Sequence, residues 1–181
     1  MKKARLLITQ NCDKNCDGCC NKHSVFKPRV LNNLNELLNY NEVMITGGEP
    51  LLYPHRIITI IDFLRQNNFK GKIYLYSAKY IQKTYYELLQ KIDGLHYTLH
   101  AEATDRDVSD LKELCNLITH SIFYGSSSET SFRLAIDKRL YAKYDFSNID
   151  FSGWHVIRKM EWQMECPLPE NEELLILGDA L

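Results

Sequence analysis

Short apolar runs alternate along the chain with segments whose apolar residues recur at helical spacing. The apolar runs have the length of buried strands and cover residues 4–9, 42–46, 72–77, 95–100, 131–137 and 156–162. Apolar side chains three or four positions apart predict helices around residues 31–38, 57–64, 81–92 and 108–118. This alternation predicts parallel strands joined by right-handed helical crossovers. The expected fold class is α/β, with a sheet that is either open or curled into a barrel.

Two parts of the pattern leave the secondary structure open. Residues 120–124 either end the helix before them or form a strand. From Pro167 the chain is acidic and then apolar, and we expect this tail to pack against the rest of the protein. A chain of 181 residues suits one domain with a sizeable core. We therefore expect a single domain over residues 1–181, with its core in residues 1–165 and a tail in residues 166–181.

The balance of charge argues against a global field for binding nucleic acid. Lysine and arginine total 22, aspartate and glutamate total 23, and the formal net charge is -1. Such a chain gives no strong nucleic-acid signal. The apolar run after the basic start is too short for a signal peptide or a membrane span. We therefore expect a cytoplasmic protein without a membrane partner.

Cysteines crowd together near the start of the chain. The six cysteines are Cys12, Cys16, Cys19, Cys20, Cys115 and Cys166. In a reducing compartment such crowding indicates metal ligands more often than disulfides. The C-x3-C-x2-C spacing of the first three suits an iron–sulfur cluster or zinc, because thiolates are soft ligands. Three cysteines on a [4Fe–4S] cluster would leave one iron open to a ligand. Zinc completed by Cys20 or His23 is the alternative.

Several polar residues follow the predicted strands directly. The turn Gly47-Gly48-Glu49-Pro50 follows the second strand, Ser77 and His100 end the third and fourth, and Arg133 lies in the fifth. Ligands bind at the carboxyl ends of parallel strands, so we expect these residues and the cysteines at one rim. The two glycines would let the backbone approach a ligand or adopt positive φ. Glu49 would pair with a cation such as an amino group, or alternatively be solvated.

The cysteine spacing and the Gly-Gly-Glu-Pro turn, taken together and in this order, resemble the radical S-adenosylmethionine (SAM) superfamily. The resemblance implies a partial (β/α)6 barrel, with Cys12, Cys16 and Cys19 holding a [4Fe–4S] cluster. It implies that the turn, with Glu49, binds the amino group of SAM. SAM would then be cleaved reductively to a 5′-deoxyadenosyl radical that abstracts hydrogen from a substrate. An electron donor such as flavodoxin or a ferredoxin is also implied.

Further roles follow only from this resemblance. Ser77 is expected near the ribose or carboxylate of SAM, and His100 on the cofactor side of the fourth strand. Arg133 is expected to bind the SAM carboxylate. Gly18 stands where many members have an aromatic residue, and its backbone would read the adenine. No residue is assigned to the hydrogen abstraction itself.

The substrate stays open at this point and could be a small molecule, a peptide or a partner protein. The stretch Cys19-Cys20-Asn21-Lys22 is similar to a short motif of the activating enzymes of glycyl radical proteins, which makes an activase the first alternative. Against it, residues 97–100 lack the aspartates typical of the fourth strand of those enzymes. An alternative of another class is a non-catalytic protein that binds an iron–sulfur cluster or zinc.

Overall fold

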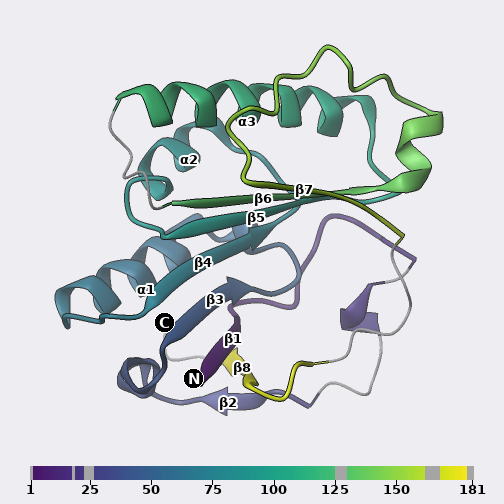
Figure 1. Cartoon of the computed structure of the whole chain (residues 1–181). Helices are drawn as coiled ribbons and strands as arrows, with labels where there is room; N and C mark the ends of the chain where they lie inside the picture. The colour runs from purple at the N-terminus through teal and green to yellow at the C-terminus, as the bar shows by residue number, and fades with distance from the viewer. Residues whose placement is uncertain (1, 18, 23–26, 125–129, 162–167, 179–181) are drawn as a thin grey trace.

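The computed structural model describes residues 2–17, 19–22, 27–124, 130–161 and 168–178 (Figure 1). Gly18, His23 and Cys166 lie outside the described residues, and so does the side chain of Cys20. The strands are β1 (Lys3–Leu7), β2 (Arg29–Leu31), β3 (Glu42–Thr46), β4 (Lys72–Ser77), β5 (Gly94–Leu99), β6 (Ser131–Asp137), β7 (Val156–Met160) and β8 (Glu172–Leu177). The α-helices are α1 (Pro54–Gln66), α2 (Gln82–Leu88) and α3 (Asp105–Tyr124). The short 3₁₀ helices are η1 (Cys20–Lys22), η2 (Leu34–Asn39), η3 (Pro50–Leu52) and η4 (Lys138–Ala142).

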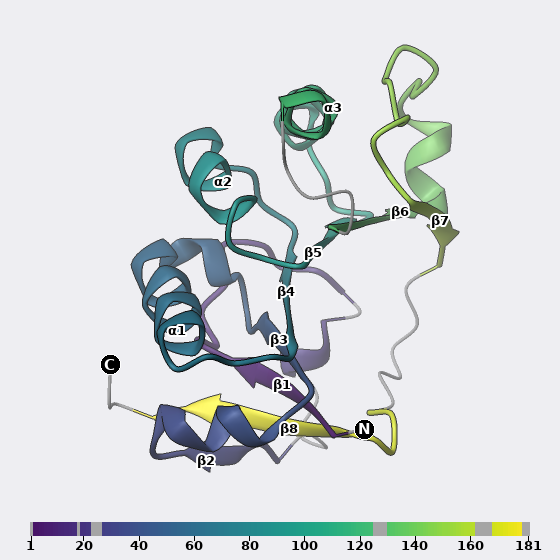
Figure 2. The ribbon, with the colours of Figure 1, turned by 60° about the vertical axis from the view of Figure 1, so that its left-hand side comes forward.

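All eight strands that the structure describes are parallel and form one sheet in the order β2-β8-β1-β3-β4-β5-β6-β7. The α/β class and the parallel sheet expected from the sequence are therefore confirmed. From β3 to β6 each strand is joined to its neighbour by one of the three α-helices, as right-handed crossovers require. Figure 2 shows these helices on one face of a sheet that curves around its other face.

The core lies between the helices and the sheet. Ile57, Ile61 and Leu64 of α1 are fully buried against strand residues such as Ile45 and Leu75. Side chains alternate between the two faces of a strand, so the residues between these apolar positions point to the face without helices. We name that second face the inner face. Within the described residues, no helix is both long and apolar enough to cross a membrane.

The structure differs from the predicted elements in two places and decides a third that the sequence left open. Residues 172–177 of the tail form β8, which inserts between β1 and β2. A helix predicted around residues 31–38 is wrong: β2 ends at Leu31 and only the 3₁₀ helix η2 follows. Residues 120–124 are the end of α3. The tail is a strand because its apolar run finds partners on both sides, a long-range pairing that periodicity does not reveal.

Candidate functional site

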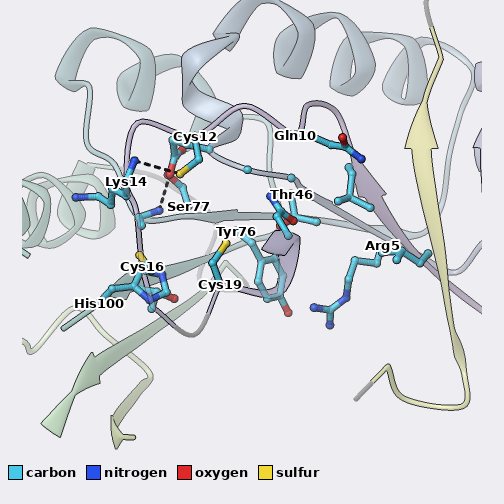
Figure 3. A pocket seen from close by; sticks show the side chains of 18 of the residues that line it. Arg5, Gln10, Cys12, Lys14, Cys16, Cys19, Thr46, Tyr76, Ser77 and His100 are labelled. Carbon is cyan, nitrogen blue, oxygen red and sulfur yellow. Dashed lines mark hydrogen bonds between the residues drawn. The ribbon is translucent and has the colours of Figure 1, made fainter. Parts of the chain in front are cut away.

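A cavity of about 280 Å³ opens at the carboxyl ends of the central strands (Figure 3). Most of the residues predicted for the rim line it, namely Cys12, Cys16, Cys19, Gly47, Gly48, Glu49, Ser77 and His100. These residues come from the loops after β1, β3 and β5 and from the last residue of β4, and these four strands are adjacent in the sheet. The parallel arrangement therefore gathers at one place side chains that are distant in the sequence.

The three cysteines lie in the loop after β1, residues 8–22, which we name the cysteine loop. Their thiols are free, with Cys12 exposed, Cys16 buried and Cys19 partly buried. Burial raises the pKa of the Cys16 thiol to about 12 and also raises that of Cys12. A cysteine binds a metal as the deprotonated thiolate, so metal binding by these thiols would release protons. Among the described residues, no three cysteine, histidine or acidic side chains form a group that could hold a metal ion.

Ion pairs and hydrogen bonds attach the cysteine loop to the loop after β4, the loop after β5 and the first turn of α3. Glu102, beyond β5, accepts a hydrogen bond of 3.1 Å from the backbone N–H of Asp17. Lys14 pairs with Asp107 at 2.5 Å, and Asp13 pairs with a lysine after β4. The sequence reasoning missed all of these residues. The sequence marks these partner residues only by their position, since each of them follows the end of a parallel strand.

The glycine pair holds the start of the cysteine loop. The N–H of Gly48 donates to the carbonyl of Thr9, and the N–H of Glu49 donates to that of Asn11, both at 2.8 Å. Gly47 has φ +149°, and a Cβ there would lie 2.4 Å from the Thr9 oxygen. A Cβ on Gly48 would lie 2.1 Å from the Asn11 oxygen. The close approach expected from the glycines is therefore made to the backbone of the cysteine loop.

Glu49 is buried, with 1% of its surface exposed, and its carboxylate is held by three donors. Oε1 accepts from the Leu51 N–H at 3.0 Å and from the Ser77 hydroxyl at 2.7 Å. Oε2 accepts from the Ala78 N–H at 2.9 Å. The burial raises the pKa of Glu49. The alternative of a solvated glutamate is therefore wrong. Ser77 donates a hydrogen bond directly to the Glu49 carboxylate.

The other predicted residues lie in different environments. His100 lines the cavity, and burial lowers the pKa of its imidazole, which favours the neutral ring. Pro50 begins η3 and is buried beneath the turn. Arg133 is not brought into this group: it is the third residue of β6 and lies beside His96 on the inner face. A residue near the start of a strand lies far from the rim at the carboxyl end of that strand. The predicted strand 131–137 already placed Arg133 near its start.

The fold and this cavity define an α/β protein with a cysteine-lined pocket at the carboxyl edge of a parallel sheet. A comparison of the sequence with models of known protein families finds no matching model. A comparison with curated proteins also finds no match.

Proposed function

We propose that this protein is a radical SAM enzyme with a partial (β/α)6 barrel. Cys12, Cys16 and Cys19 would hold a [4Fe–4S] cluster, and the turn with Glu49 would bind the amino group of SAM. The observation that carries the proposal is that all three cysteines and this turn line one cavity. The types and spacing of these residues in the sequence led to the same assignment.

The kinds of donor around the cavity suit such a cluster and its cofactor, although the described cysteines do not form a metal-binding group in this structure. Three thiols and no further cysteine among the described lining residues would leave one iron without a protein ligand. Glu49 lines the same cavity, and its carboxylate would supply the negative charge that an ammonium group requires. When bound and reduced by an electron donor, the cluster would supply the electron that cleaves SAM into methionine and a 5′-deoxyadenosyl radical, the species that would abstract hydrogen from the substrate.

The chain itself would bind, orient and shield the reactants. The hydrogen bond from Ser77 and those from two backbone amides hold the Glu49 carboxylate in one orientation before any ligand arrives. The ion pair of Lys14 with Asp107 holds the cysteine loop over the strand ends. A neutral His100 at the cavity wall would add hydrogen-bonding capacity without adding charge.

The test is anaerobic reconstitution of the full chain with iron and sulfide, followed by dithionite and SAM. We expect the absorbance of a [4Fe–4S] cluster and the release of 5′-deoxyadenosine, detected by mass spectrometry. Cys12→Ala should abolish both. Cys115→Ala is the matched control, because Cys115 is buried in the core against Trp154 and does not line the cavity. Cluster formation without 5′-deoxyadenosine would favour a non-catalytic iron–sulfur protein and contradict the proposal.

A second variant tests the role of the turn. Glu49→Gln removes the negative charge but keeps the side-chain length and one acceptor oxygen. We expect it to assemble the cluster and to bind SAM at least about tenfold more weakly, the effect of losing one charge-assisted hydrogen bond. Unchanged SAM affinity with an intact cluster would show that Glu49 does not bind the amino group.

A further inference from the structure

Arginines gather on the inner face of the sheet, beside the cavity. Tyr76 of β4 is paired in register with His96 of β5, and His96 with Arg133 of β6. Paired residues of parallel strands point to the same face, so these three side chains form a row there. Arg158 of β7 lies one row further along the strands, opposite Ala135. Figure 2 shows that the α-helices cover the other face.

Two of these arginines carry charge that no described carboxylate neutralises. Arg5 of β1, also on the inner face, pairs with Glu172 at 2.6 Å. Arg133 donates to the hydroxyl of Ser131 at 3.3 Å, and neither it nor Arg158 has an acidic partner within the part of the chain that the structure describes. Both are exposed.

Three carboxylates on the inner face are each paired with a cation. Glu42 pairs with Lys3 at 3.2 Å and Asp137 pairs with Arg139 at 2.8 Å, in addition to Glu172. The positive charge of the arginines reaches His96: after burial, which is the largest cause, the guanidinium groups lower the pKa of this histidine to about 4. The imidazole is therefore neutral, and the local field is positive.

Aromatic rings lie next to these guanidinium groups. The rings of Tyr76 and His96 stack with centroids 4.7 Å apart and an angle of 23°. Tyr74 lies against Gly94, where a Cβ would come within 2.6 Å of the ring, and Arg133 lies 5.8 Å from the centre of Tyr74. Such rings bind the planar or apolar part of a ligand.

This surface is continuous with the cavity of the cysteines. Arg5, Tyr76 and Thr98 line that cavity, and Thr98 is the next inner-face residue after His96 on β5. In Figure 3, Arg5 and Cys12 lie on opposite sides of the cavity with Tyr76 between them. A molecule anchored at the arginines would therefore extend across Thr98 toward the cysteines.

We propose that the substrate is a small organic oxyanion, a carboxylate or a phosphate ester, whose anionic group binds Arg133 and Arg158. Its planar or apolar part packs against the stacked pair of Tyr76 and His96, with the reacting carbon toward the cysteine loop. Guanidinium groups bind either oxyanion through paired hydrogen bonds, which fixes the orientation of the ligand. This assignment rests on the proposed function for its reaction, while the binding itself needs no cluster. It gives Arg133 a substrate role in place of the SAM carboxylate.

Ligand-observed NMR on the full chain without iron tests the binding. The probes are phenyl phosphate, benzoate and, as the uncharged control, benzyl alcohol. We expect at least one anion to bind more tightly than the alcohol, and the tighter anion identifies phosphate or carboxylate as the favoured group. Arg133→Gln and Arg158→Gln should each lower the affinity for that anion roughly tenfold, the effect of losing one charge-assisted interaction. The matched control is Lys159→Gln, which removes one positive charge from the opposite face of β7 and should leave binding unchanged.

Three outcomes would overturn the inference. The first is equal binding of both anions and the alcohol, and the second is equal weakening by the arginine variants and Lys159→Gln. The third is an Arg133→Gln variant whose reconstituted form binds SAM more weakly while the probes bind as before, which would assign Arg133 to the cofactor. Release of 5′-deoxyadenosine is measured separately on the same variants, so a failure of the radical SAM assignment is recognised independently of the anion result.

Discussion

Replacing Glu49 with alanine tests whether its carboxylate is also a structural acceptor. The side chain is buried, and in the wild type it satisfies the N–H groups of Leu51 and Ala78 and the hydroxyl of Ser77. In Glu49→Ala both amides lose their acceptor. The turn that carries the site and the end of β4 are held together through this one carboxylate, so the loss should reach the global free energy of unfolding.

The size of the effect follows from the donors left without a partner. An unsatisfied buried donor costs about 1–3 kcal/mol, which applies in full to the Leu51 amide and in part to the half-buried Ala78 amide. Removing a carboxylate whose burial disfavours ionisation offsets part of this cost. We expect Glu49→Ala to lose about 2–3 kcal/mol. Ser77→Ala, which leaves both amides bonded to the carboxylate, should lose about 1 kcal/mol.

Urea unfolding of the protein without iron, followed by circular dichroism, measures both variants under one condition. The absence of the cluster separates the structural role of the carboxylate from any role in binding SAM. A loss in Glu49→Ala no larger than that in Ser77→Ala would refute the reasoning, because the two amide hydrogen bonds would then contribute nothing. The wild type and both variants should unfold with the same denaturant slope, so that midpoints can be compared directly.

Three further predictions concern the turn, the inner face and β8. Gly48→Ala puts a methyl group 2.1 Å from the Asn11 oxygen, so urea unfolding should show a loss of about 2 kcal/mol or more; an unchanged midpoint would contradict the contact. The pKa of His96 is lowered to about 4 from 6.5, so below pH 6.5 the unfolded chain takes up a proton that the folded chain refuses. The free energy of unfolding of the wild type should therefore fall by about 2 kcal/mol more than that of His96→Phe between pH 6.5 and pH 5. Parallel profiles of stability against pH for the two proteins would contradict this role of His96. Hydrogen bonds, the largest from Lys2, lower the pKa of Glu173 from 4.5 to about 2, so its contribution is complete above pH 4.5 and is lost as the pH falls toward 2. Screening at this partly exposed site limits the contribution to about 1 kcal/mol, measured as the stability difference from Glu173→Gln at pH 7 and at pH 2.5.

Local pattern was sufficient for the strands whose apolar runs are bounded by turns. The boundaries predicted for residues 42–46, 72–77 and 131–137 are those of β3, β4 and β6. It failed at residues 31–38, where the leucine spacing of a helix occurs in a segment that η2 occupies before β3 begins. It also predicted only a packed tail for residues 172–177, which form β8 because they pair with β1 and β2. Helical periodicity is a local property, whereas strand insertion depends on partners far along the chain.

The amino-acid sequence by itself determined the alternation of strands and helices, and hence a parallel sheet whose strands end at one rim. It determined the thiols and the turn with Glu49 as the groups that share the cavity, because parallel strands align their carboxyl ends. Only the tertiary structure decided how these groups are held. In the structure Glu49 is buried among three hydrogen-bond donors, and the two glycines pack closely against the backbone of the cysteine loop. Arg133 lies on the inner face and not at the rim. Burial, backbone contact and register all depend on residues distant in the chain, and no local pattern encodes them.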